Sequence, residues 1–163
     1  MSTSRLKKFQ AGIKGPLFIG ALIFALDRIS KILVLKFLAP AGSFAIAPFF
    51  RLTYVENTGA AFGSFKNGNI YLALISAAVL FMMFKWKPEL DRLGAAARWG
   101  FVFIAAGALG NMYDRVALGF VVDYFDFIVW PVFNVADSFI CIGAGLIILA
   151  AVKDGRKKKS EAK

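Results

Sequence analysis

The stretch VVDYFDFIVWPVFNVADSF, residues 121–139, contains three acids, Asp123, Asp126 and Asp137, but no Lys, Arg or His. Its first half alternates β-branched and aromatic residues and therefore predicts a strand or extended segment, which the Trp130-Pro131 dipeptide then interrupts. The chain around it is strongly apolar, and an unpaired carboxylate near hydrocarbon is costly. The three acids therefore need partners elsewhere in the chain, or a function.

The second half of the stretch predicts the start of a helix. Asn134 is a natural N-cap residue, so Asp137 falls in the first turn, where the helix dipole stabilises an anion. The 13 residues between Asp123 and Asp137 are enough for the chain to fold back and bring the two acids together. Two such acids in a partly desolvated site would titrate as a pair, and the helix dipole favours Asp137 as the ionised member.

The composition around this stretch is that of a membrane protein. The chain has 163 residues, 59% of them hydrophobic, and a mean hydropathy of +0.67, which exceeds that of ordinary soluble domains. Four runs are apolar enough to cross a bilayer, and we expect four transmembrane helices in one membrane-embedded domain covering residues 1–163. The runs are residues 16–38, 69–84, 99–113 and 138–152.

The net charge of +10 follows the predicted topology. Fourteen of the 20 basic residues lie before the first run, between the second and third, or after the fourth. By the positive-inside rule, both termini (residues 1–15 and 153–163) are then cytoplasmic. This distribution argues against a nucleic-acid-binding role and suggests that the basic tail contacts anionic lipid. The fourteen are Arg5, Lys7, Lys8, Lys14, Lys85, Lys87, Arg92, Arg98, Lys153, Arg156, Lys157, Lys158, Lys159 and Lys163.

The first apolar run also resembles a cleavable signal sequence, because a basic segment precedes it and residues 45–47, Ala-Ile-Ala, imitate a cleavage site. That site lies about twenty residues beyond the Leu17–Leu26 stretch that resembles a signal-sequence core, and Pro48 follows it. We therefore expect the run to remain as the first membrane helix.

Several chemistries are excluded by residue type. The chain has no histidine, which removes Ser-His-Asp and Cys-His catalysis and the usual zinc sites. Its single cysteine, Cys141, provides neither a disulfide nor a CxxC motif. Ser30 and Lys31 are adjacent and would point in different directions on a helix, which argues against a Ser-Lys dyad. We expect no metal and no cofactor.

Charged and polar residues mark two of the runs. Asp27 and Lys31 are four residues apart in the first run, so they share a helix face and can neutralise each other. In the third run, Ala106 and Gly110 form a small-xxx-small pair that allows close helix packing. Asn111 and Arg115 follow Gly110 and share a helix face. The charge of Asp114 can be explained by its position where the helix emerges into water.

The segment between the first two runs has the residue pattern of strands and turns and not that of a membrane helix. FFRLTYVEN, residues 49–57, alternates along its length and predicts a short strand or hairpin outside the membrane. NTGAAFG, residues 57–63, suits a turn with close backbone approach.

Three functional classes fit these residues. A pair of carboxylates can act as general acid and general base, as in aspartic proteases. Paired acids in membrane helices also serve proton-coupled carriers or channels. The acids of a scaffold protein would only pair with basic groups such as Arg115 and Lys31. The carrier reading is weakened because only Asp27 lies well inside a run.

Five motifs together resemble those of bacterial lipoprotein signal peptidases, also called signal peptidase II. They occur in the order of that family and extend from Asp27 to Asp137. They are DRISK at 27–31, NTGAAFG at 57–63, GALGNMYDRV at 107–116, GFVVDYFDF at 119–127 and FNVAD at 133–137.

The resemblance implies an aspartic endopeptidase of the bacterial cytoplasmic membrane. Such enzymes remove the signal peptide of prolipoproteins before a diacylglyceryl-modified cysteine, at the extracytoplasmic side, need no metal, and are inhibited by globomycin-type cyclic peptides. Their fold has four transmembrane helices, an extracytoplasmic β-rich cradle and a short helix near the membrane surface. The resemblance assigns the catalytic dyad to Asp123 and Asp137. It assigns site-lining or supporting positions to Asn57, Gly59, Asn111, Arg115, Asn134 and Ala136, and first-helix motif positions to Asp27 and Lys31.

The chain departs from the family pattern in two places. Ala106 stands where a glycine is frequent, and the segment between the two acids is compact, which affects the outer wall of the site. Asp126 has no motif role, and we expect it to be a solvated residue at the membrane surface.

Overall fold

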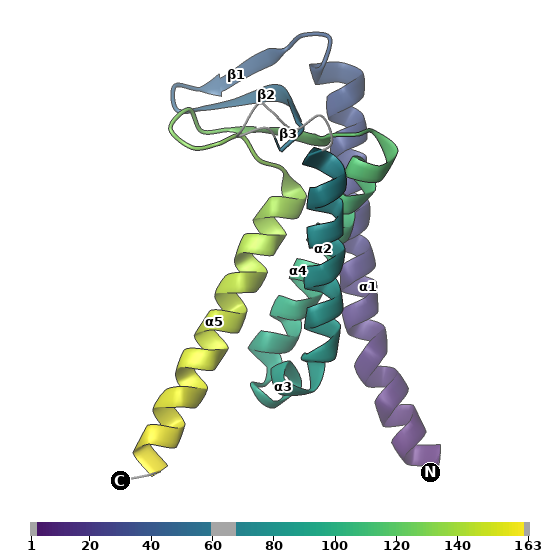
Figure 1. Ribbon diagram of the computed structural model, residues 1–163, viewed down its shortest axis with the longest axis vertical. Helices are drawn as coiled ribbons and strands as arrows, with labels where there is room; N and C mark the ends of the chain where they lie inside the picture. Colours follow the sequence, from purple (N-terminus) through teal and green to yellow (C-terminus); the bar gives the residue numbers. More distant parts are fainter. Residues whose placement is uncertain (1–2, 60–67, 162–163) are drawn as a thin grey trace.

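The computed structural model describes residues 3–59 and 68–161. Four long helices extend from a small sheet at one end of the molecule, and both chain termini lie at the opposite end (Figure 1). In chain order the elements are α1 (Thr3–Leu33), the π-helical turn η1 (Val34–Leu38), β1 (Ser43–Ala47), β2 (Phe50–Asn57), α2 (Gly68–Lys85), α3 (Lys87–Arg92), α4 (Ala95–Ala117), β3 (Val121–Asp126) and α5 (Val135–Glu161).

Each of the four apolar runs forms a helix, as the sequence predicts. The helices extend beyond the apolar runs into the charged segments that flank them. In α5, for example, Lys158 forms an ion pair with Asp154, one helical turn away. Among the described residues, α5 is the one helix that meets a strict length and hydropathy criterion for a membrane span, with a mean hydropathy of 2.3. A shorter apolar helix covers Asn69–Lys85. The small helix α3 was not predicted.

Helix α4 is the centre of the helical part, since α1, α2 and α5 all pack against it. Glycines allow the closest approach. A Cβ atom on Gly100 would lie 2.5 Å from the carbonyl oxygen of Gly143, and one on Gly107 would lie 2.5 Å from that of Ala136. The predicted small pair, Ala106 and Gly110, is buried, but Gly110 makes room for the carboxylate of Asp27 on α1.

The sheet is antiparallel in the order β1-β2-β3, which confirms both the predicted strand around residues 49–57 and the predicted strand around Asp123. In the register of β2 and β3, Val55 is opposite Asp123 and Arg51 is opposite Asp126. After β3 the chain folds back, and Phe133 pairs with Phe125 just before α5 begins. The end of the sheet strand and the start of the last helix are thereby held together.

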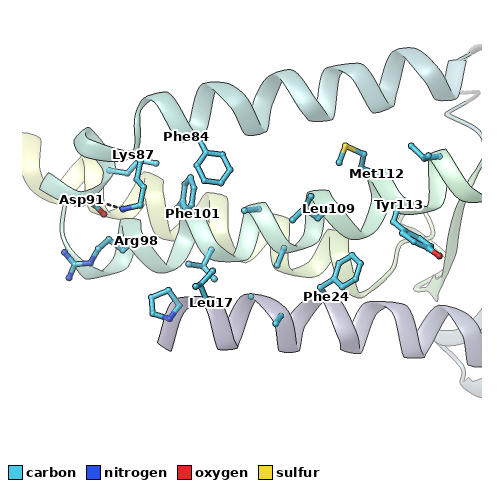
Figure 2. A pocket seen from close by; sticks show the side chains of 18 of the residues that line it. Leu17, Phe24, Phe84, Lys87, Asp91, Arg98, Phe101, Leu109, Met112 and Tyr113 are labelled. Atoms are coloured by element: carbon cyan, nitrogen blue, oxygen red, sulfur yellow. Dashed lines mark hydrogen bonds and ion pairs between the residues drawn. The ribbon is translucent and has the colours of Figure 1, made fainter. Parts of the chain in front are cut away.

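An apolar groove of about 850 Å³ runs between α1 and α2 and has α4 as its floor (Figure 2). Figure 2 shows Phe24, Phe101 and Leu109 along it and the Lys87–Asp91 ion pair near one end. The glycines of α4 that contact α5 do not line this groove. Asp123 and Asp137 do not line it either, so it is a feature separate from the two carboxylates.

The contact between α4 and α5 yields a prediction about stability. Gly107→Ala places a methyl group against the backbone of Ala136 and should lower the free energy of unfolding by about 1–3 kcal/mol. Gly145→Ala, in α5, is the matched control because its Cβ meets nothing within 4 Å. The control should be neutral or stabilising by up to about 1 kcal/mol. Denaturant unfolding in detergent measures both, and equal stability of the two variants would contradict the packing.

Candidate active site

Asp123 lies on β3 with only 1% of its surface exposed, and side-chain amides occupy both of its carboxylate oxygens. Asn57 Nδ2, at the end of β2, donates to Oδ2 at 2.8 Å. Asn134 Nδ2, just before α5, donates to Oδ1 at 2.6 Å. The strand register explains the first contact, because the end of β2 runs beside β3 at this point.

Asp137 lies in the first turn of α5, as predicted, and is half-buried. Its carboxylate accepts hydrogen bonds from Asn111 Nδ2 at 2.7 Å and from the backbone N–H of Asn134 at 3.3 Å. Asn134 Oδ1 in turn accepts the backbone N–H of Asp137 at 2.9 Å. This reciprocal cap begins the helix and directs the carboxylate toward Asn111.

Two asparagines connect the acids. Asn134 Nδ2 lies 3.1 Å from Asn111 Oδ1, in addition to its bond with Asp123. A continuous path of amide groups therefore runs from Asp123 through Asn134 and Asn111 to Asp137. The structure thus brings together the two acids that the resemblance paired, and the asparagines that it placed around them.

A buried ammonium group orients one of these amides. Lys31 Nζ donates a hydrogen bond to Asn111 Oδ1 at 2.8 Å and forms ion pairs with Asp27 Oδ2 at 3.0 Å and Asp114 Oδ2 at 2.8 Å. Because Asn111 Oδ1 receives this bond, its Nδ2 is the group that turns toward Asp137. The predicted pair of Asp27 and Lys31 is confirmed, and both side chains are fully buried.

Asp114 has a larger role than the sequence suggested. The expectation that it marks a helix end in water is wrong, since it is fully buried. It pairs with Arg28 and Lys31 and accepts the backbone N–H of Val122 at 3.2 Å. Two acids and two bases from α1 and α4 therefore form a charge-balanced cluster, and Asp27 extends it by accepting the backbone N–H of Ala136 at 3.0 Å. Spacing alone could have placed Asp114 near Arg115 but not beside α1.

Arg115 is half-buried on α4, and its positive charge acts on Asp137 and Asp123. Its buried Nε atom has no hydrogen-bond partner among the described residues. A buried donor without a partner is costly, so this atom is available to an acceptor that enters the site.

Gly59 and Ala136 support the site through their backbones. Gly59 adopts a φ of 74°, a conformation that favours glycine, and its N–H donates to Asn57 Oδ1 at 2.8 Å. That bond fixes which face of the Asn57 amide points at Asp123. Ala136 is fully buried against Gly107. The remainder of the predicted turn at 57–63, from residue 60 onward, lies outside the described residues.

Asp126 is not the solvated residue that the sequence suggested. It is 5% exposed, and its carboxylate accepts hydrogen bonds from Arg51 Nε at 2.6 Å, Thr53 Oγ1 at 2.8 Å and the N–H of Ile128 at 2.8 Å. These bonds, that from Ile128 first, lower the pKa of Asp126. Asp126 thus has its own partners, apart from those of Asp123.

Burial raises the pKa of Asp123 to about 6, and the nearby charge of Asp137 adds to the effect, whereas the hydrogen bonds from Asn57 and Asn134 oppose it. A carboxyl group in this condition can keep a proton while a neighbouring carboxylate is ionised. The arrangement is therefore suited to general acid and general base catalysis by a pair of acids.

Comparison with known proteins identifies the family. The model of a family described as signal peptidase (SPase) II matches residues 19–153, which is most of the chain. The chain belongs to the signal peptidase II family. A lipoprotein signal peptidase from Alteromonas mediterranea is 40% identical over 156 residues, covering 89% of this chain and 84% of the relative. One from Actinobacillus succinogenes is 43% identical over 157 residues, covering 89% and 94%.

Solved structures agree with this family. A bacterial membrane enzyme solved by the in meso method at 2.3 Å resolution is 30% identical, with a TM-score of 0.77, over 90% of this chain and 92% of the other. A second one, at 1.9 Å, is 29% identical with a TM-score of 0.75. Membership in this family makes the chain a peptidase, and it disfavours the carrier and scaffold interpretations.

The buried cluster yields a second prediction. Lys31→Met leaves Asp27 and Asp114 without their shared ammonium and should lower the free energy of unfolding by about 3–5 kcal/mol, because it uncovers buried charge. The double variant Lys31→Met/Asp27→Asn removes one of those charges and should recover part of the loss. Denaturant unfolding in detergent compares the three proteins. A single variant as stable as the wild type would show that the cluster is not ionised as described.

Proposed function

We propose that the chain is an aspartic endopeptidase that removes the signal peptide from diacylglyceryl-modified prolipoproteins and cuts before the lipidated cysteine. Asp123 and Asp137 form its catalytic dyad. The observation that supports this most directly is the amide-linked pair of acids at the junction of β3 and α5. The relatives named lipoprotein signal peptidase support the substrate class.

In the proposed reaction Asp137 is the ionised member, since it lies at the N-terminus of α5, and Asp123 keeps a proton. Asp137 takes a proton from a water molecule as the water oxygen attacks the scissile carbonyl carbon. Asp123 donates its proton to the carbonyl oxygen, which gives a neutral tetrahedral diol. When the C–N bond breaks, Asp137 returns its proton to the leaving nitrogen, and Asp123 recovers the proton of the diol hydroxyl.

The surrounding groups hold the acids and the substrate. Asn57, Asn111 and Asn134 hold the two carboxylates without adding a competing nucleophile. A peptide drawn out of a helical signal segment exposes backbone groups that need partners in an apolar setting. The buried Nε of Arg115 is a suitable donor for one of its carbonyl oxygens.

We further propose that α1, α2, α4 and α5 cross the bacterial cytoplasmic (inner) membrane as one domain, with both termini in the cytoplasm. The basic residues gather in the terminal segments and around α3, at the end away from the sheet (Figure 1). Large apolar side chains such as Leu17, Phe37 and Phe81 are more than 60% exposed on the helices, which suits contact with lipid. The sheet and the dyad then lie at the extracytoplasmic surface, where the lipidated cysteine is located, and the basic tail faces anionic lipid.

Globomycin-type cyclic peptides are the expected inhibitors. A cyclic peptide is conformationally restricted, so it can present a polar group to both acids at a low entropic cost. Binding to this chain is proposed from its membership in the family.

Replacement of either acid tests the dyad. Asp123→Asn and Asp137→Asn should each reduce cleavage of a diacylglyceryl-modified prolipoprotein peptide by at least about 100-fold, since each removes one proton-transfer group. Asp91→Asn is the matched control, because among the described residues this acid pairs with Lys87 alone, at the far end of the molecule. Each variant is first shown to be folded in detergent. Normal cleavage by either dyad variant would overturn the assignment.

The pH dependence gives a further test. Because the pKa of Asp123 is about 6 in the free protein, kcat/KM should fall as pH rises through that value, by about tenfold per unit. The hydrogen bond from Asn57 lowers this pKa, so Asn57→Ala should move the decline to higher pH. A profile that is flat from pH 5 to 8, or a shift to lower pH in Asn57→Ala, would contradict the role of Asp123 as proton donor.

A further inference from the structure

The segment that follows Asp126 exposes a group of large apolar side chains. Residues 127–130, Phe-Ile-Val-Trp, are 40%, 51%, 93% and 66% exposed, respectively. The end of β1 adds Ile46 at 55%, and the turn that follows adds Phe49 at 67%. Phe50 lies against Phe127 with ring centroids 4.7 Å apart, so both loops are at the same end of the sheet. We call Ile46, Phe49 and residues 127–130 together the apolar tip.

Hydrogen bonds hold the backbone of the tip in a defined conformation. Ile128 has a φ of 67°, which is unfavourable for a β-branched residue and persists only where neighbouring groups hold it. Asp126 imposes it by accepting the Ile128 N–H at 2.8 Å, and Arg51 and Thr53 anchor the same carboxylate. Three part-buried hydrogen bonds to the Asp126 carboxylate thus maintain a strained turn that presents an outward-facing apolar surface.

We propose that the apolar tip inserts into the extracytoplasmic leaflet of the membrane and holds the strand that carries Asp123 at the depth of the lipid interface. This rests on the topology proposed above. Trp130 lies only four residues before Asn134, which caps α5, the helix that meets the criterion for a membrane span among the described residues. In Figure 1 the end of the sheet and the loop after β3 extend sideways above the upper end of α5.

The chemistry of the tip favours lipid over a protein partner. Tryptophan and other aromatic residues prefer the level of the lipid headgroups, where one end of the ring is apolar and the other is hydrated. The guanidinium of Arg51 is 45% exposed beside the tip, which places a positive charge where lipid phosphates lie. Exposed apolar side chains beside a partly exposed guanidinium resemble an interfacial anchor.

Trp130 provides a direct measurement. In a Trp86→Phe/Trp99→Phe background it is the only tryptophan, since the chain has three. The full chain is placed in vesicles of phosphatidylcholine and phosphatidylglycerol with bromine at shallow or deep acyl positions, in the absence of substrate. We expect shallow bromines to quench Trp130 emission at least twofold and deep bromines to quench it less, and aqueous acrylamide to quench it weakly.

A charge in the tip should remove this contact. Val129→Asp should at least halve the quenching by shallow bromines, and Val129→Ala should have a smaller effect of the same sign, which keeps the test valid if the first variant folds poorly. Ala41→Asp is the matched control because this exposed residue lies at the opposite end of β1, and its quenching should equal that of the background protein.

Three results would overturn the proposal. Strong acrylamide quenching with no bromine effect would place the tip in water. Quenching that depends on protein concentration would indicate a second copy of the chain on this surface. An unchanged bromine effect in Val129→Asp would show that the contact of Trp130 with lipid does not require insertion of the rest of the tip. Cleavage by the same proteins in detergent is measured separately, so a failure of the proposed peptidase function is distinguishable from a failure of membrane insertion.

Discussion

The buried ammonium of Lys31 is the interaction on which the rest of the structure depends. It forms ion pairs with Asp27 and Asp114 and donates a hydrogen bond to Asn111. An unpaired charge in this position would be prohibitive, so α1 and α4 are constrained to the one arrangement that supplies all three acceptors. The same contacts extend to the backbone of Val122 on β3 and, through Asp27, to that of Ala136 on α5. The sheet and the last helix are therefore positioned relative to a single charged group.

Through these contacts the ammonium also orients the two acids of the proposed dyad. The ammonium fixes the orientation of Asn111, and Asn111 directs a donor to Asp137. Asn134 caps α5 and at the same time contacts Asp123, so the element that begins the helix also links the two carboxylates. Since each amide uses both its oxygen and its nitrogen in this network, rotation of either side chain would break two bonds. The carboxylates are thus oriented before any substrate arrives.

Asp126 shows how a third acid is kept apart from this chemistry. Adjacent residues of a strand alternate between faces, so Asp123 and Asp126, three positions apart, point to opposite sides of β3. On that other side, Asp126 accepts hydrogen bonds from Arg51 and Thr53. It also accepts the N–H of Ile128, which holds the turn formed by residues 127–130. One strand therefore contributes to a site on one face and to an anchored apolar loop at its end.

The sequence by itself determined the four long helices, two of the strands, the helix start at Asn134 and the family. These depend on local periodicity, capping residues and motif order. It also indicated the Asp27–Lys31 pair, since that contact lies within one helix turn. It was wrong about Asp114 and Asp126, and it gave no sign of the small helix α3. Only the tertiary structure decided which partners these two acids have. Arg28 and Arg51 are 86 and 75 residues away from them in the chain, and whether a charged side chain is solvated or buried depends on such distant contacts, which no local pattern contains.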